Sequence, residues 1–232
     1  MPSAAAPRNS DLKLRTLSAI VMIAVAGTAL WLSGVVWQVF VLAVSVGVLW
    51  EWNRLVRAIA GSRWARLLWL AVGVAYVGTA GEVLVSMPVL FGRLGPLIPV
   101  MLVIATDVGA YFSGRALGGP KIAPRVSPSK TWSGLGGGAL LAACVSVALA
   151  FAAAGRYLAG QPVVIAKCAL LGALVAVIAQ AGDFFESWMK RRAGVKDSGS
   201  LLPGHGGLFD RVDGLLAVLF VAGLLVGIGR LF

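Results

Sequence analysis

The sequence predicts an all-α, polytopic membrane protein with about seven spans, although six to nine spans fit the pattern. Hydrophobic residues make up 59% of the 232-residue chain and charged residues 12%, and the mean hydropathy is +0.91. Ordinary soluble domains are roughly 45–50% apolar and about 25% charged. No internal repeat or soluble-like section interrupts the sequence. Residues 1–232 are therefore predicted to form a single integral membrane domain.

The first two spans are predicted to form a hairpin. Residues 16–50 contain no Asp, Glu, Lys or Arg. As one helix they would reach ~52 Å at ~1.5 Å per residue, far more than a hydrocarbon core of ~30 Å. Two helices that turn near Ser33 and Gly34 fit better. The small-residue stretch at 1–12 is predicted to be a disordered cytoplasmic tail.

Five further largely apolar runs predict the remaining spans, at about 66–81, 95–114, 133–155, 163–187 and 214–230. Residues 83–92 are also apolar, but they are too short to cross a bilayer alone and contain Pro88. This segment is predicted to be a re-entrant piece or one half of an eighth span.

The distribution of cations predicts that the N-terminus is cytoplasmic. Lys and Arg near span ends are retained on the cytoplasmic side, and seven spans place 16 of the 20 Lys and Arg residues in inner segments. The protein is thus expected in the cell (plasma) membrane, with its charged loops facing the cytoplasm. Its net charge of +11 is spread over four inner segments, which suits membrane lipids and phosphorylated ligands and argues against nucleic acid as a partner.

Acidic residues gather late in the sequence, where five of the nine Asp and Glu residues fall between 183 and 213. A spacing of i, i+3, i+4 and i+7 predicts that one helix face carries Asp183, Glu186, Ser187 and Lys190. Asp210 and Asp213 stand where the last span begins. Carboxylates from two helix ends, without a Cys or His cluster, suit Mg²⁺ or another divalent cation, or two such ions, held together with substrate phosphates.

The same carboxylates could instead have simpler structural roles. Asp213 could cap the last helix, because a helix N-terminus favours negative charge. Asp183 could pair with Lys190 or Arg191, which follow on the same predicted helix.

The glycine-rich stretch at 203–207 is a second candidate feature. Gly206 and Gly207 would let backbone amides approach an anion closely. His205 is the only histidine of the chain, and a lone histidine is more often a hydrogen-bonded loop residue than a catalyst.

A second polar segment, 107–134, begins inside a predicted span. Asp107 and Tyr111 stand four residues apart on one helix face, which places an ionisable residue at membrane depth, where it is costly and usually functional. The run SPSKT resembles the end of a phosphate-binding P-loop, but the glycines that this motif requires are replaced by Pro124 and Ser129.

The lysines of this segment, Lys121 and Lys130, are either phosphate-binding cations or ordinary positive charges of an inner loop. Gly134 and Gly138 open the next span as a GxxxG pair, which predicts close helix packing inside the molecule or in a homodimer.

Several of these motifs resemble one enzyme family. The run from Ser187 to Asp213, SWMKRRAGVKDSGSLLPGHGGLFDRVD, is similar to the signature of phosphatidate cytidylyltransferases, or CDP-diacylglycerol synthases. GDFFES at 182–187, DVGAYFSGR at 107–115 and APRVSPSKTWSG at 123–134 also resemble family segments. The last run departs from the family pattern at Ser129 and Ser133, where Lys and Glu are common.

The resemblance implies that a cytidylyl group passes from CTP to phosphatidic acid, giving CDP-diacylglycerol and pyrophosphate at the cytoplasmic membrane face. Asp183 and Asp210 are then the implied metal ligands, with Asp213 as a neighbour and Asp197 as a supporting carboxylate. Lys190, Arg191, Lys196 and Arg211 are expected to contact phosphates, and His205 to position substrate. The full set of expected substrate-binding residues is Asp107, Tyr111, Lys121, Ser127, Lys130, Thr131, Ser187, Arg191, Gly206 and Gly207.

The same residues give less support to other functions. Transporters place essential charges near the bilayer midplane in paired broken helices, whereas here the charges collect at one face and no repeat is present. A scaffold protein would have no reason to concentrate carboxylates and cations in one loop. An enzyme that uses CTP with another lipid acceptor, such as a prenyl-ether lipid phosphate, stays open.

Overall fold

The computed structural model describes residues 9–229, with side chains for 13–227. Its α-helices are α1 (Asn9–Leu32), α2 (Gly34–Ile59), α3 (Arg63–Phe91), α4 (Leu97–Leu117), α5 (Trp132–Ala154), α6 (Pro162–Arg192) and α7 (Phe209–Gly229). A hairpin of β1 (Lys121–Ala123) and β2 (Ser127–Thr131) and a short 3-10 helix, η1 (Gly155–Gly160), complete the described elements.

The predicted all-α, polytopic architecture is confirmed. Within residues 9–229, six helices are long and apolar enough to cross a membrane, namely α1 to α6, and α7 is the seventh helix. The predicted turn between the first two spans is also confirmed, since α1 ends at Leu32 and both Ser33 and Gly34 have positive φ. Large apolar side chains are exposed along these helices, as contact with lipid requires.

The prediction of a separate membrane segment at 83–92 is wrong, because α3 continues through Pro88 to Phe91. A proline inside a helix leaves the carbonyl four residues earlier without its usual donor. That carbonyl belongs to Leu84, and it accepts a hydrogen bond of 3.1 Å from the indole Nε1 of Trp37 on α2. A neighbouring helix thus pairs the exposed carbonyl, and the helix does not need to break.

The predicted tail at 1–12 also needs correction, because α1 begins at Asn9. Residues 1–8 lie outside the described residues. The segment 107–134 contains a further difference, since 121–131 forms antiparallel strands in which Lys121 pairs with Thr131. This hairpin fixes Lys130 on a strand instead of in a free loop.

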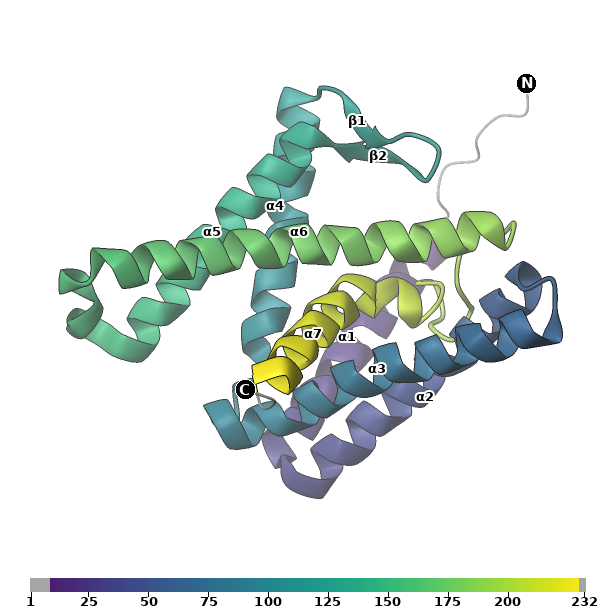
Figure 1. Cartoon of the computed structure of the whole chain (residues 1–232), viewed down its shortest axis with the longest axis horizontal. Helices are drawn as coiled ribbons and strands as arrows, with labels where there is room; N and C mark the ends of the chain where they lie inside the picture. Colours follow the sequence, from purple (N-terminus) through teal and green to yellow (C-terminus); the bar gives the residue numbers. More distant parts are fainter. Residues whose placement is uncertain (1–8, 230–232) are drawn as a thin grey trace.

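Helix α6 lies between the two halves of the molecule (Figure 1). On one side it packs against α5 and α4, which carry the hairpin; on the other it packs against α7, which contacts α3. The main core fills this second side around Trp52, and Met189 of α6 and Phe209 of α7 are fully buried in it. The two polar segments, 107–134 and 183–213, therefore meet along α6.

Glycines allow α4 and α5 to pack closely. A Cβ atom at Gly138 would lie 2.7 Å from the Thr106 carbonyl oxygen, and one at Gly134 would lie 3.0 Å from that of Ala110. Internal packing is thus confirmed for this GxxxG pair. The homodimer stays a prediction that this pair does not support, because both glycines already face α4.

We expect Gly138→Ala to lower the free energy of unfolding by about 1–3 kcal/mol, because the added methyl group would overlap the α4 backbone. The matched control is Gly136→Ala, where a Cβ atom would meet nothing within 4 Å. Thermal unfolding of both variants in detergent micelles measures the difference. Equal stability of the two variants would contradict the packing described here.

Candidate active site

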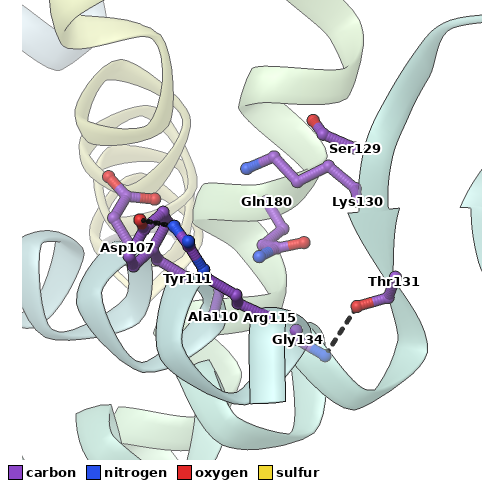
Figure 2. Close-up of a pocket in the computed structure, with 10 residues that line it drawn as sticks. Asp107, Ala110, Tyr111, Arg115, Ser129, Lys130, Thr131, Gly134 and Gln180 are labelled. Atoms are coloured by element: carbon purple, nitrogen blue, oxygen red, sulfur yellow. Dashed lines mark hydrogen bonds between the residues drawn. The ribbon is translucent and has the colours of Figure 1, made fainter. Parts of the chain in front are cut away.

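A cavity of about 530 Å³ opens between α4, β2, α5 and α6. Figure 2 shows Asp107 and Tyr111 projecting from α4, Lys130 and Thr131 from the hairpin, and Gln180 from α6. The remaining lining residues are Ala110, Gly114, Arg115, Ser129 and Gly134. Its volume is in the usual range for small-molecule sites. Four of the predicted substrate-binding residues, Asp107, Tyr111, Lys130 and Thr131, thus line one cavity.

The hairpin and α6 are joined by an ion pair beside this cavity. Lys130 Nζ lies 2.5 Å from Asp183 Oδ2, and Ser187 Oγ donates to Asp183 Oδ1 at 3.3 Å. The alternative that Asp183 pairs with Lys190 or Arg191 is therefore wrong. The reason is distance along the helix, since Lys190 lies seven residues, about 10.5 Å, beyond Asp183 on α6 and its ammonium group is held by Glu186 and Asp210.

Lys190 links α6 to α7 through two carboxylates. Its Nζ lies 2.6 Å from Glu186 Oε2 and 2.7 Å from Asp210 Oδ1. Asp210 Oδ2 also accepts backbone N–H hydrogen bonds from Ser198 at 3.0 Å and Gly207 at 2.8 Å. Lys190, which is predicted to contact phosphate, therefore has two carboxylate partners in this structure. Asp210 in turn holds the loop before α7 through the Ser198 and Gly207 N–H groups.

Asp213 does not cap α7, so this alternative role from the sequence is wrong. Helix α7 begins at Phe209, so Asp213 lies beyond its first residues, and its Oδ1 accepts from the Gly214 N–H at 2.8 Å. The backbone of Asp213 packs so closely on α6 that a Cβ atom at Gly182 would lie 2.7 Å from its carbonyl oxygen. This contact brings Asp213 near Asp183, and the charges of Asp183 and Lys130 both act on it.

The arrangement is chemically suited to a divalent cation, although the described residues form no ready-made cage. In the part of the chain that the structure describes, no three His, Cys, Asp or Glu side chains gather as a metal site. Mg²⁺, however, is commonly bound by one or two carboxylates together with substrate phosphates and water. Asp183 and Asp213, with Asp210 one turn away, supply hard oxygen ligands of this kind.

The loop before α7 is held by a carboxylate that was not predicted from the sequence. Glu51 of α2 is fully buried. Its Oε2 accepts from Ser198 Oγ at 2.8 Å and from the Phe209 N–H at 2.8 Å, and its Oε1 accepts from the Leu208 N–H at 3.0 Å. Glu51 thus caps α7 from another helix. Any side chain at Gly199 or Gly207 would collide with it or with Ser198.

A signal for Glu51 was present in the sequence. It is the only acidic residue between Asp11 and Glu82, and an ionisable residue among apolar spans usually has a specific role. Gln180 was missed as well, because an uncharged amide inside an apolar run gives no charge signal.

The other predicted residues lie around the cavity without lining it. His205 Nδ1 is 2.7 Å from Ser18 Oγ on α1, and Arg211 donates to the His205 carbonyl oxygen through Nε and Nη2. Arg191 Nε donates to the Val126 carbonyl oxygen at 3.4 Å. Lys121, Lys196 and Asp197 are exposed, as are Arg191 and Arg211, and Ser127 is buried in the hairpin. Gly206 packs against Asp197 and Asp210.

We expect Glu51→Ala to lower the free energy of unfolding by at least ~2 kcal/mol, because it leaves buried donors of the α7 N-terminus without an acceptor. The exposed residue Glu82 of α3 provides the control, Glu82→Ala. Thermal unfolding and limited proteolysis of the 194–208 loop measure the effect. A Glu51→Ala protein as stable and as protease-resistant as Glu82→Ala would refute the cap.

Comparison with known proteins gives one consistent result. Residues 62–228 match the model of the cytidylyltransferase family. The phosphatidate cytidylyltransferase of Brucella suis is 37% identical over 96% of this chain and 95% of its own length. That of Rickettsia bellii is 31% identical over 94% of this chain and 93% of its own, and that of Bacillus subtilis is 40% identical over 51% and 42%. The chain belongs to the phosphatidate cytidylyltransferase family.

Proposed function

We propose that the cavity and the 183–213 segment together form the site at which a cytidylyl group passes from CTP to phosphatidate, giving CDP-diacylglycerol and pyrophosphate for phospholipid biosynthesis. The observation that carries this proposal is the junction of two charged segments on α6. Lys130 reaches Asp183 from the hairpin, and Lys190 reaches Asp210 on α7. Paired cations and carboxylates beside a cavity among membrane helices suit a reaction between a polyanionic nucleotide and an anionic lipid.

The reaction joins two anions. An oxygen of the lipid phosphate bonds to the α-phosphorus of CTP, while the bond from that phosphorus to the bridging oxygen breaks and pyrophosphate leaves. A phosphate monoester has a second pKa of about 6 and is largely dianionic at neutral pH, so it needs little help from a general base. Catalysis must then come mainly from positioning and from neutralisation of charge.

The cations of the site fit this requirement. Lys130 and Lys190 each have carboxylate partners, which hold their ammonium groups in place before substrate arrives. We assign these two lysines, with Arg191, Lys196 and Arg211, to the phosphate groups. His205 contacts Ser18 and lies outside the cavity lining, which favours a positioning role over proton transfer.

A divalent cation is part of the proposal. Asp183 and Asp213, from two helices in close contact, and Asp210 are the residues that would hold it. When bound, Mg²⁺ would neutralise phosphate charge on the attacking and leaving oxygens. Asp197 lies against Gly206 beside Asp210 and would support these ligands.

The activity itself is tested with purified protein in mixed micelles that contain phosphatidic acid and Mg²⁺. CTP, ATP, GTP and UTP are supplied separately, and release of pyrophosphate and nucleotide-lipid product is followed. We expect product with CTP, and loss of product when EDTA removes the divalent cation. Absence of product with CTP in folded protein would overturn the proposed function.

We expect Asp183→Asn and Asp210→Asn each to lower the rate of cytidylyl transfer by about 100-fold or more, because both remove negative charge where a cation is held. His205→Ala should cost less, about fivefold, as expected for one positioning hydrogen bond. Glu82→Gln serves as the control, and thermal unfolding shows that each variant is folded. Near-normal rates in either aspartate variant would refute the metal assignment, and an equal loss in His205→Ala would indicate proton transfer by the histidine.

A further inference from the structure

The side chain of Gln180 is the least explained polar group of the cavity. It is 4% exposed, and neither its Nε2 nor its Oε1 has a hydrogen-bond partner among the described residues. Buried amides are nearly always paired, because water otherwise solvates them better than the protein interior. Gln180 lines the cavity, and Figure 2 shows its amide between Lys130 of the hairpin and Asp107 of α4. A ligand group in the cavity is the natural partner.

The position of Gln180 along α6 indicates which part of the substrates it meets. Helix α6 ends with Lys190, Arg191 and Arg192, and its residues 168–182 carry no charge. Gln180 is three residues before Asp183, about 4.5 Å further from the charged end. A polar lipid with its phosphate near Asp183 would extend its tails in the same direction. The groups that follow the phosphate in a diacyl lipid are the glycerol and its two ester carbonyls.

We propose that Gln180 Nε2 donates a hydrogen bond to an ester carbonyl of the lipid acceptor, and that this contact selects diacyl lipids over ether-linked lipids. The inference rests on the proposed function and adds the chemical class of its acceptor. An ester carbonyl oxygen accepts a hydrogen bond well, whereas an ether-linked lipid has no carbonyl group at the corresponding position. Gln180 Oε1 is also unpaired among the described residues, and a water molecule in the cavity can donate to it.

Recognition of the nucleotide base is the competing role for this amide. The base enters with a water-soluble polyanion, which the Lys and Arg residues at the charged end of α6 attract. A free glutamine amide can also rotate and exchange its donor with its acceptor, so that it would pair with the edge of cytosine or of uracil. Gln180 alone therefore does not explain a choice of base. Its place on the tail side of Asp183 favours the lipid.

The test compares two lipid acceptors with the same headgroup charge and chain length, a diacylglycerol phosphate and a di-O-alkylglycerol phosphate. We measure kcat/KM for each with saturating CTP, in wild-type protein and in Gln180→Met. Wild-type protein should prefer the diacyl lipid by about fivefold, the value of one hydrogen bond. In Gln180→Met the ratio should fall to about one, while the rate with the ether lipid is retained.

Two further variants strengthen the test. Gln38→Met makes the same change on an exposed face of α2, and it should keep the wild-type ratio. Gln180→Glu removes the amide donor at nearly constant shape, and it should lose the diacyl preference even if the Met variant does not fold.

The outcomes separate this inference from the function on which it rests. Transfer by wild-type protein at equal rates to both lipids, or an unchanged ratio in the Gln180 variants, would overturn the role of Gln180 alone. A changed KM for CTP with an unchanged lipid ratio would assign the amide to the nucleotide and also overturn it. No transfer to either lipid by folded wild-type protein would overturn the proposed function, and this inference with it.

Discussion

The buried carboxylate of Glu51 connects the N-terminal helices to the charged loop. It accepts hydrogen bonds from two backbone N–H groups at the start of α7 and from Ser198 Oγ. Because a buried helix N-terminus cannot leave its donors unpaired, α7 can begin where it does only with such an acceptor. Asp210 lies in the first turn of α7, and its distance from Lys190 therefore depends on an interaction made by α2. The N-terminal helices thus contribute to the geometry of the candidate site.

Two lysines organise the site around α6. Lys130 joins the hairpin to Asp183, and Lys190 joins Glu186 to Asp210. Each ammonium group lies among carboxylates that lower the cost of burying it. Anionic substrates would compete with these carboxylates for the same cations.

The membrane constrains the backbone as strongly as the side chains. Helices in lipid must satisfy their own hydrogen bonds or find donors from neighbours. Trp37 provides such a donor for the Leu84 carbonyl that Pro88 leaves unpaired, and this contact allows α3 to remain one helix. Close packing of α4 and α5 through glycines then brings Asp107 and the hairpin to opposite sides of the same cavity.

The sequence alone determined the class of protein, the seven helices, the first turn and the family, because hydropathy, span length and a long motif are all local along the chain. It also singled out Asp107 and Lys130, which line the cavity, and Asp183, which pairs with Lys130; their roles in the reaction stay predictions. Only the tertiary structure decided which cation meets which carboxylate, that residues 83–92 extend α3, and that Glu51 caps α7. These depend on contacts between elements distant in sequence, because the element that packs beside a side chain, and not its spacing along its own helix, selects its partner. The buried, unpaired amide of Gln180 could be found for the same reason only in the structure, because its lack of a partner depends on its surroundings.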